Sequence, residues 1–280
     1  MLRQCATMPY IEHEGARLFW TEKGTGQPIL LIMGLSFTHE MWHRTLPALT
    51  RYRAILFDNR GMGRSSVPPG PYSIRQMARD ADAVLTAADA DSAHVIGASM
   101  GGMIAQELAL LSPQRVRSLT LACTSYSGLF ARWPDLRCAP RWTLWSKPTP
   151  EQREQSWRKL LYSDTTPAMR IEEDIRVRCA CTCDRKGFFN QLAGILMWNS
   201  YWRLPRIGAP TLVIHGDQDR LVPPQNGKTV AKRIPGAKFQ LIPNAGHILM
   251  TDQPETCCAA LTWFLSEQTS FSAKGSGVCG

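Results

Sequence analysis

The stretch that decides the fold is His94-Val-Ile-Gly97-Ala-Ser99-Met-Gly101-Gly102-Met-Ile-Ala-Gln-Glu-Leu-Ala-Leu-Leu111. It opens with an apolar run that is typical of a buried strand and then passes through a Gly-x-Ser-x-Gly sequence. Beyond the serine, apolar residues recur at the intervals of one helix face, at Met103, Ile104, Leu108 and Leu111. The pattern predicts a strand, a sharp turn and a helix.

Ser99 is a candidate nucleophile because of this context. Gly97 and Gly101 remove the Cβ atoms that would clash where the strand and the helix converge, so the serine is exposed at the strand tip. The following helix directs its first N–H groups at the same point, which makes the N–H of Met100 a candidate oxyanion donor. The alternative is a tight turn whose serine only caps a helix.

Strand-like and helix-like segments alternate on both sides of this stretch. Strands are predicted over residues 10–13, 16–22, 29–33, 53–58, 93–97, 116–123, 210–216 and 238–242, and helices over residues 39–49, 72–88, 226–234 and 254–265. This alternation predicts the α/β class, with a doubly wound, mostly parallel sheet.

The residue pattern and composition of the sequence change between residues 125 and 204. This segment has no clear strand period, contains repeated prolines and holds most of the tryptophans. We interpret it as a helical cap inserted over the carboxyl edge of the sheet. The core then comprises residues 1–124 and 205–267, and the small, polar residues 268–280 are expected to form a disordered tail.

Composition is that of an ordinary globular protein, with 280 residues, 44% of them apolar and 20% charged. The net charge of +9 raises the possibility of a nucleic-acid partner, but the basic residues are scattered, so none is predicted. No apolar window is long enough to span a bilayer, and the first ten residues lack the apolar core of a signal peptide. Nine cysteines in a chain of this length fit reduced thiols, so we expect a soluble cytoplasmic protein with no membrane partner.

A serine hydroxyl needs a base and an orienting carboxylate to attack a carbonyl. His247 is the best candidate base, since it follows Gly246 in a loop directly after a predicted strand. The candidate acids are Asp217 and Asp219, which follow another strand. Asp219 is favoured because Asp217 could simply satisfy turn N–H groups, whereas Asp219 has more reach toward His247. His215, at the strand end, is interpreted as a packed core residue.

A tetrahedral intermediate needs a second oxyanion donor besides Met100. Gly34, directly after the strand over residues 29–33, lets the backbone turn toward Ser99, so the N–H of Leu35 is the candidate donor. The alternative for Gly34 is a simple turn glycine.

Several motifs together resemble the α/β-hydrolase superfamily: Gly97-Ala-Ser-Met-Gly-Gly102, Phe57-Asp-Asn-Arg-Gly-Met-Gly-Arg-Ser-Ser66, His215-Gly-Asp-Gln-Asp219 and Gly246-His247. The chain order of Ser99, Asp219 and His247 is the one that this fold uses. Two of the motifs are most similar to the capped branch that holds 3-oxoadipate enol-lactonases, carboxylesterases and aclacinomycin methylesterases. This resemblance implies hydrolysis of a small-molecule carboxylic ester or lactone by a serine esterase, with no metal and no organic cofactor.

Two other functions stay open. Carbon–carbon bond hydrolases of aromatic ring-cleavage products share this triad, the cap and the Ser-Met-Gly-Gly motif. A ligand-sensing protein on a hydrolase fold is a further alternative, although all three triad positions are filled here.

Substrate contacts are expected from Gly34 and from the cap tryptophans Trp133, Trp142 and Trp198, although a tryptophan cluster also fits cap packing. Arginines make the cap basic, which favours either carboxylated substrates or a solvated surface: Arg132, Arg137, Arg141, Arg176, Arg178, Arg203 and Arg206. Cys179, Cys181 and Cys183 lack the spacing of a metal site, and no metal is predicted there. The natural substrate and the oligomeric state are left open.

Overall fold

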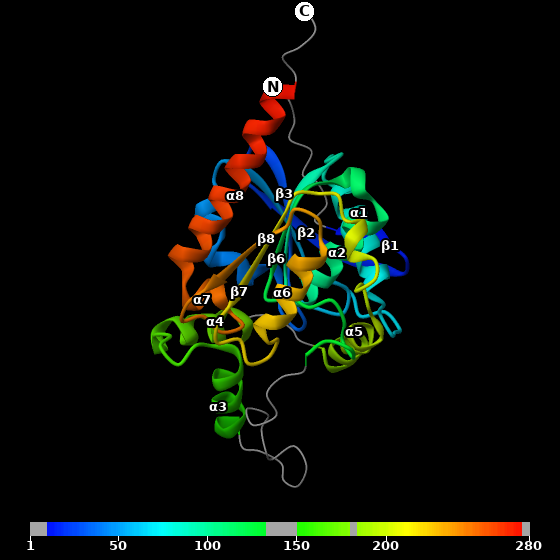
Figure 1. Ribbon diagram of the computed structural model, residues 1–280. Helices are drawn as coiled ribbons and strands as arrows, with labels where there is room; N and C mark the ends of the chain where they lie inside the picture. The colour runs from blue at the N-terminus through cyan, green and yellow to red at the C-terminus, as the bar shows by residue number, and fades with distance from the viewer. Residues whose placement is uncertain (1–9, 133–149, 180–183, 276–280) are drawn as a thin grey trace, which may run out of the picture.

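The computed structural model of the protein describes residues 10–132, 150–179 and 184–275, and in them a sheet carries helices on both faces (Figure 1). The strands of this described part are β1 (Tyr10–His13), β2 (Ala16–Lys23), β3 (Gln27–Ile32), β4 (Tyr52–Phe57), β5 (Ala93–Ala98), β6 (Val116–Ala122), β7 (Thr211–Gly216) and β8 (Lys238–Ile242). Their order in space is β1-β2-β4-β3-β5-β6-β7-β8. The pairs β1–β2 and β2–β4 are antiparallel and the later pairs are parallel, which confirms the predicted sheet.

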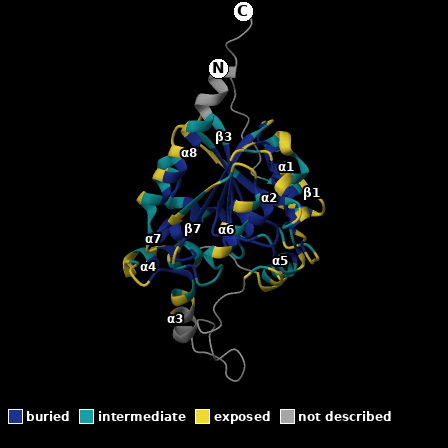
Figure 2. Cartoon of the chain, viewed as in Figure 1, coloured by how far each residue is buried: buried dark blue, intermediate teal, exposed yellow. Residues whose placement is uncertain are grey.

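Both faces of the sheet are buried, and this explains the continuous apolar runs of its central strands. In β3, Leu30 and Ile32 point into one hydrophobic cluster, while Ile29 and Leu31 point into the other. Figure 2 shows the resulting buried centre with the exposed residues at its periphery. The sheet therefore divides the core into two layers.

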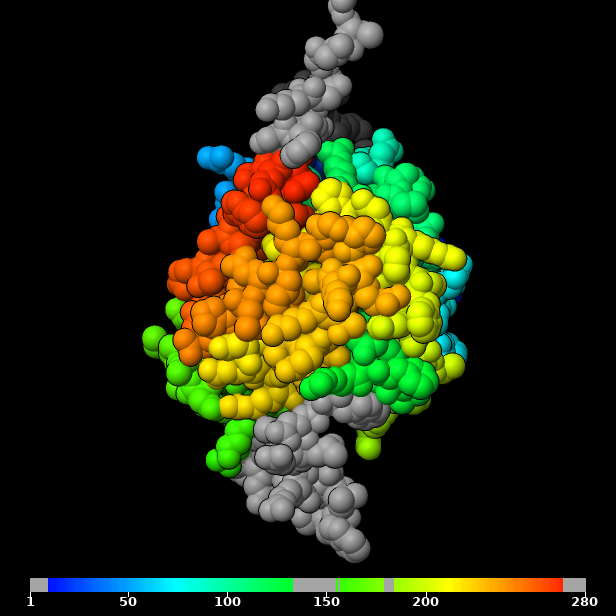
Figure 3. All heavy atoms as spheres, viewed as in Figure 1, coloured from blue at the N-terminus to red at the C-terminus, as the bar shows by residue number. Residues whose placement is uncertain are grey.

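The main helices cover these two faces. Helices α1 (Ile74–Ala87), α2 (Met100–Leu111) and α6 (Pro224–Arg233) contribute to the first cluster, and α8 (Pro254–Gly275) contributes to the second. The segment from α6 to β8 forms a continuous outer surface, yellow to orange, beside the red α8 in Figure 3. Among the described helices, none has the combination of length and apolar character that crossing a membrane requires.

The order of the strands also creates a crossing point. The chain leaves β3 to form β4 on one side of it and later returns to form β5 on the other side. Loops that follow β3 and β5 therefore diverge, and in open α/β sheets this point at the carboxyl ends of the strands is where ligands bind.

The inserted segment, defined here as residues 125–204, lies between β6 and β7. Its described part contains α3 (Pro150–Leu161), α4 (Ala168–Cys179) and α5 (Arg185–Met197), and its one β-pairing is an isolated bridge between Ser127 and Asn199. These helices lie at one end of the sheet (Figure 1). The remaining short helices of the described chain are η1 (His39–Arg44), η2 (Leu46–Leu49), η3 (Pro113–Arg115), η5 (Leu204–Arg206) and α7 (Leu249–Asp252).

Two predicted elements differ from the structure. The single helix expected over residues 39–49 is replaced by two 3₁₀ helices, η1 and η2. Pro47 explains the break, because its ring would clash with the carbonyl four residues earlier in an α-helix.

The tail is the second difference. Disorder was predicted from residue 268, but α8 continues to Gly275. A helix that is already formed extends with one added hydrogen bond per residue, so a weakly helical sequence can follow it. Residues 276–280 lie outside the described residues.

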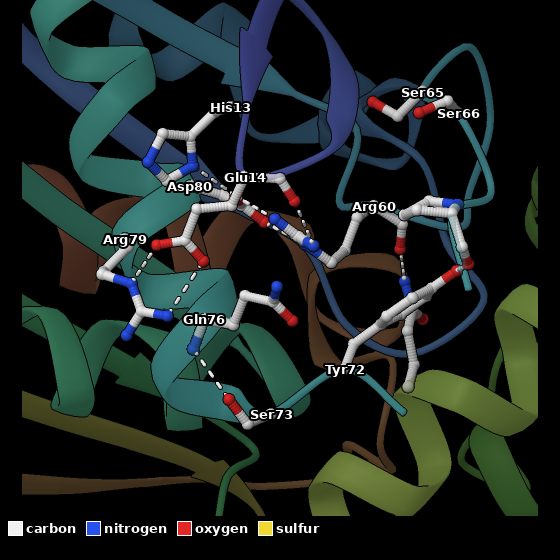
Figure 4. A network of polar contacts seen from close by, with 12 residues as sticks. His13, Glu14, Arg60, Ser65, Ser66, Tyr72, Ser73, Gln76, Arg79 and Asp80 are labelled. Atoms are coloured by element: carbon white, nitrogen blue, oxygen red, sulfur yellow. Dashed lines mark hydrogen bonds and ion pairs between the residues drawn. The ribbon is translucent and has the colours of Figure 1, made fainter. Parts of the chain in front are cut away.

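A buried ion pair joins the loop after β4 to α1. The guanidinium of Arg60 donates to both carboxylate oxygens of Asp80 at 2.6 Å, and each side chain is 1% exposed (Figure 4). His13 of β1 adds a contact of 2.8 Å from its Nδ1 to Asp80 Oδ1. Arg60 is therefore fixed in place by a carboxylate whose two oxygens both have hydrogen-bond partners.

Removal of this carboxylate should destabilise the protein strongly. We expect Asp80→Leu to lower the free energy of unfolding by about 3–5 kcal/mol, because it leaves the Arg60 charge buried and unpaired. The neighbouring Arg79 forms an exposed pair with Glu14, so Arg79→Leu should cost no more than about 1 kcal/mol. Urea denaturation measures both free energies of unfolding, and equal losses would show that the buried pair contributes no more than the exposed pair.

Candidate active site

Ser99 lies at the sharp turn between β5 and α2. Its φ of 56° and ψ of −119° are a strained conformation for a residue with a side chain. Close backbone packing holds this turn: a Cβ on Gly97 would lie 2.3 Å from the carbonyl oxygen of Gly101. The Ser99 carbonyl also accepts a hydrogen bond of 2.7 Å from the Thr124 hydroxyl. Glycine is therefore required at position 97.

His247 comes from the loop after β8 and faces Ser99. Its Nε2 lies 3.0 Å from Ser99 Oγ, and its Nδ1 lies 2.9 Å from Asp219 Oδ2. The loop is tied on both sides, since Gly246 N donates to Asp252 Oδ2 at 2.6 Å and Ile248 N donates to the Leu161 carbonyl at 2.9 Å. The three side chains thus form one hydrogen-bonded chain.

Asp219 follows β7 and is 4% exposed. Its Oδ1 accepts hydrogen bonds from the backbone N–H groups of Leu221 and Val222 at 3.0 and 2.8 Å. Burial by itself raises the pKa of this carboxyl, but the charge of His247 and hydrogen bonds from His215 and His247 lower its pKa to about 2. The carboxylate is therefore ionised at neutral pH and can stabilise a protonated imidazole.

The two other polar residues near β7 have different positions. Asp217 is exposed and accepts a hydrogen bond from Ala245 N at 3.2 Å, as expected for a turn residue. His215 is fully buried, as expected, but it also contacts the acid: its Nε2 lies 3.2 Å from Asp219 Oδ2 and 2.8 Å from the Val222 carbonyl. This contact is not apparent from the sequence, because i, i+4 spacing brings side chains together only within a helix.

The turn after β3 brings a backbone loop against Ser99. A Cβ on Gly34 would lie 3.0 Å from Ser99 Cβ, so only glycine leaves normal spacing there. Two residues later, Ser36 has a φ of 61°, which turns the chain sharply. Leu35, the predicted donor, lies between them and lines the same pocket as Met100.

A side chain from the inserted segment holds this turn. Gln191 of α5 is fully buried, accepts a hydrogen bond from Ser36 N at 3.4 Å and donates one to the Arg60 carbonyl at 2.8 Å. From the other side, Asn59 Nδ2 donates to the Met33 carbonyl at 2.9 Å. The turn that carries Leu35 is therefore positioned jointly by the core and the inserted segment. Gln191 was not singled out from the sequence.

Two spaces of different size meet at Ser99 and His247. The larger has a volume of about 340 Å³ and is lined mainly by apolar side chains of the inserted segment, among them Trp157, Phe188 and Leu192. The smaller, about 30 Å³, is enclosed by Met33, Met41, Met250 and their neighbours. Phe37 lines both spaces.

The substrate contacts predicted for three tryptophans have different outcomes. Trp198 is a correction: it is 8% exposed, packs in the first hydrophobic cluster and donates from Nε1 to Glu107 Oε2 at 2.9 Å. A buried carboxylate draws its indole away from the pocket. Trp133 and Trp142 lie outside the described residues. Trp157, which the sequence analysis gave no substrate role, lines the larger space.

Of the three clustered cysteines, one lies within the described residues. Cys179 ends α4, while Cys181 and Cys183 lie outside the described residues. Within the described part of the chain, no cluster of three or more His, Cys, Asp or Glu side chains could hold a metal ion.

Comparison with known proteins places this chain in a family. The model of the alpha/beta hydrolase family matches residues 29–260. The chain belongs to the alpha/beta hydrolase family.

Several hydrolases are similar to this chain along nearly its whole length. A relative from Azorhizobium caulinodans that is named as a carbamate hydrolase, RutD, is 34% identical over 266 residues, covering 93% of this chain and 99% of its own. The structure of Est816, described as an N-acyl homoserine lactone degrading enzyme, is 29% identical with a TM-score of 0.79, covering 91% and 100% of the two chains. A thermophilic esterase from Thermogutta terrifontis is 26% identical with a TM-score of 0.76, covering 93% and 97%.

The position of Gln191 leads to a test of the turn. We expect Gln191→Leu to lower kcat for p-nitrophenyl acetate by about 10- to 100-fold with little change in KM, because the Leu35 N–H, the predicted oxyanion donor, would shift while the pocket stays. Steady-state kinetics measures this. Phe189→Ala, at an exposed position of the same helix, is the control. A loss confined to KM would exclude the positioning role.

Proposed function

We propose that the protein is a serine hydrolase that cleaves a carboxylic ester or lactone through an acyl-enzyme intermediate on Ser99. The observation that carries this proposal is the continuous hydrogen-bonded chain from Ser99 Oγ through His247 to Asp219. Ser99 at the end of this hydrogen-bonded chain faces a mainly apolar pocket, which suits the hydrocarbon part of an acyl or alcohol group. The esterase and lactonase relatives support the same reaction class.

The proposed first half-reaction is acylation. His247 Nε2 accepts the proton of the Ser99 hydroxyl while Oγ forms a bond to the acyl carbon. Asp219 stabilises the imidazolium, and the N–H groups of Leu35 and Met100 donate to the oxyanion. His247 then returns the proton to the leaving alkoxide as the bond to the alcohol oxygen breaks.

Deacylation repeats these steps with water. His247 accepts a proton from water, whose oxygen attacks the acyl carbon, and the same two N–H groups stabilise the second tetrahedral intermediate. Collapse of that intermediate returns the proton to Ser99 Oγ and releases the carboxylic acid. No group other than the triad has to move a proton.

We further propose that the inserted segment acts as the cap that selects the substrate. Its helices supply much of the wall of the larger space, including Trp157, Phe188 and Leu192. The smaller space, about 30 Å³, has room for about two or three water-sized groups, since one water needs about 10–15 Å³ on this measure. A preferred ester therefore has one bulky side and one side no larger than about two carbons.

The nucleophile and the acid can be tested with matched variants. Ser99→Ala should lower kcat for p-nitrophenyl acetate by at least about 10³-fold and abolish covalent labelling by a fluorophosphonate probe. Asp219→Asn should also lower kcat by about 10³-fold or more, whereas the exposed Asp217→Asn should retain nearly full activity.

Other outcomes of this test have defined meanings. Labelling and hydrolysis that persist in purified Ser99→Ala would refute the proposal. Turnover of an aromatic ring-cleavage product far above that of any ester would instead support a carbon–carbon bond hydrolase.

The unequal spaces lead to a prediction about substrate shape. Butyl acetate or methyl pentanoate should be hydrolysed at least about 10-fold faster than butyl pentanoate, whose second long chain meets the methionine wall of the smaller space. Met41→Ala should raise the rate for butyl pentanoate selectively, because it enlarges that space. Product acid measured by titration at constant pH gives the rates. Equal rates for all three esters would show that the smaller space does not limit the substrate.

A further inference from the structure

Among the described residues, one arginine in the wall of the larger space lies against an aromatic ring and pairs with no carboxylate. Arg178, near the end of α4, lines this space together with Ser99 and Phe37. Its guanidinium carbon lies 4.8 Å from the centroid of the Phe37 ring, and Phe37 follows the turn that carries Leu35. The charge is thus held against an aromatic face beside the proposed reaction centre.

Two other arginines join the core to the inserted segment through ion pairs. Arg44 donates to Glu173 and Asp174, and Arg203 lies 2.8 Å from Glu107. Within the described residues, the Arg178 guanidinium makes no hydrogen bond or ion pair. Asp174, one turn earlier on α4, already accepts hydrogen bonds from Arg44, Tyr162 and Thr251.

The charged side chains that line the larger space in the described part of the chain are positive. Its described lining contains Arg178 and Arg132 but no aspartate or glutamate. The Arg132 backbone is fixed by Asn226, which accepts from Arg132 N and donates to Arg132 O at 2.9 Å each. In a mainly apolar pocket such cations create a strong positive potential, since little water screens them. A half-buried cation without a partner is also unfavourable unless a ligand supplies the anion.

We propose that Arg178 binds a carboxylate of the substrate, so that the preferred substrates are esters or lactones with a carboxylate on the chain that fills the larger space. This proposal rests on the proposed hydrolase function. A guanidinium binds a carboxylate through two parallel N–H···O bonds, which fixes direction as well as charge. The apolar lining between Arg178 and Ser99 holds the methylene chain that separates the carboxylate from the ester carbonyl.

The test compares a carboxylate with a neutral group of the same shape. One pair is monomethyl adipate and its ω-carboxamide analogue, which place the charge on the acyl side. The other is 6-acetoxyhexanoate and 6-acetoxyhexanamide, which place it on the alcohol side. In at least one pair, wild-type kcat/KM should be about 10- to 100-fold higher for the carboxylate, the range expected of a charge-assisted hydrogen bond.

Two variants on α4 assign this preference to a residue. Arg178→Met should bring the ratio of carboxylate to carboxamide kcat/KM close to one. The control is Arg176→Met, because Arg176 is exposed on the same helix and does not line the space; it should keep the wild-type ratio. A wild-type ratio near one in both pairs, or a ratio that Arg178→Met leaves unchanged, would overturn the proposal.

A binding measurement separates this proposal from the hydrolase proposal. Calorimetric titration of wild-type protein with adipate should give a Kd at least about 10-fold lower than that of Arg178→Met. That result supports the anion site even if no ester is hydrolysed. Conversely, Ser99-dependent hydrolysis of neutral esters with equal adipate binding by both proteins would retain the hydrolase and reject the anion site.

Discussion

The rest of the site depends on the close backbone contact between Gly97 and Gly101. This contact allows the chain to reverse direction within one residue, so that Ser99 takes a φ of 56° and leaves the sheet at its carboxyl edge. A side chain at Gly97 would separate β5 from α2, and a side chain at Gly101 would press α2 away from the Ile32 carbonyl at the end of β3. The neighbouring turn at Gly34 depends on the same geometry, because it packs directly against Ser99 Cβ.

The remaining parts of the site are fixed by short backbone hydrogen bonds instead of by bulk packing. Asp219 is oriented by two N–H groups of its own loop, and the His247 loop is tied to Asp252 and Leu161. Burial raises the pKa of Asp219, but the charge of His247 and the hydrogen bonds from both neighbouring imidazoles outweigh burial and lower the pKa to about 2. A rigid and permanently charged acid is the arrangement that holds an imidazole in one orientation.

Much of this could be predicted from local sequence patterns. Buried parallel strands are recognisable as continuous apolar runs, and the loops after them carry Ser99, Asp219 and His247 in an order that the fold explains. What could not be predicted depends on contacts between distant segments. Gln191 meets the turn at Ser36 only after α5 has packed onto the core, and Trp198 is turned inward by Glu107, 91 residues earlier. Arg178 was one of seven candidate arginines, and only the folded chain distinguishes those that line the pocket from those in solvent.

The bridge made by Gln191 has a consequence for how this architecture can diversify. One amide joins the Ser36 N–H to the Arg60 carbonyl, and Arg60 is in turn anchored on Asp80. The inserted segment is therefore connected by hydrogen bonds to the turn beside Ser99 and to the Arg60–Asp80 ion pair. A chimaera that received this segment from a relative would have to bring a matching amide with it, and recombination at residues 125 and 204 would not be a neutral exchange of modules.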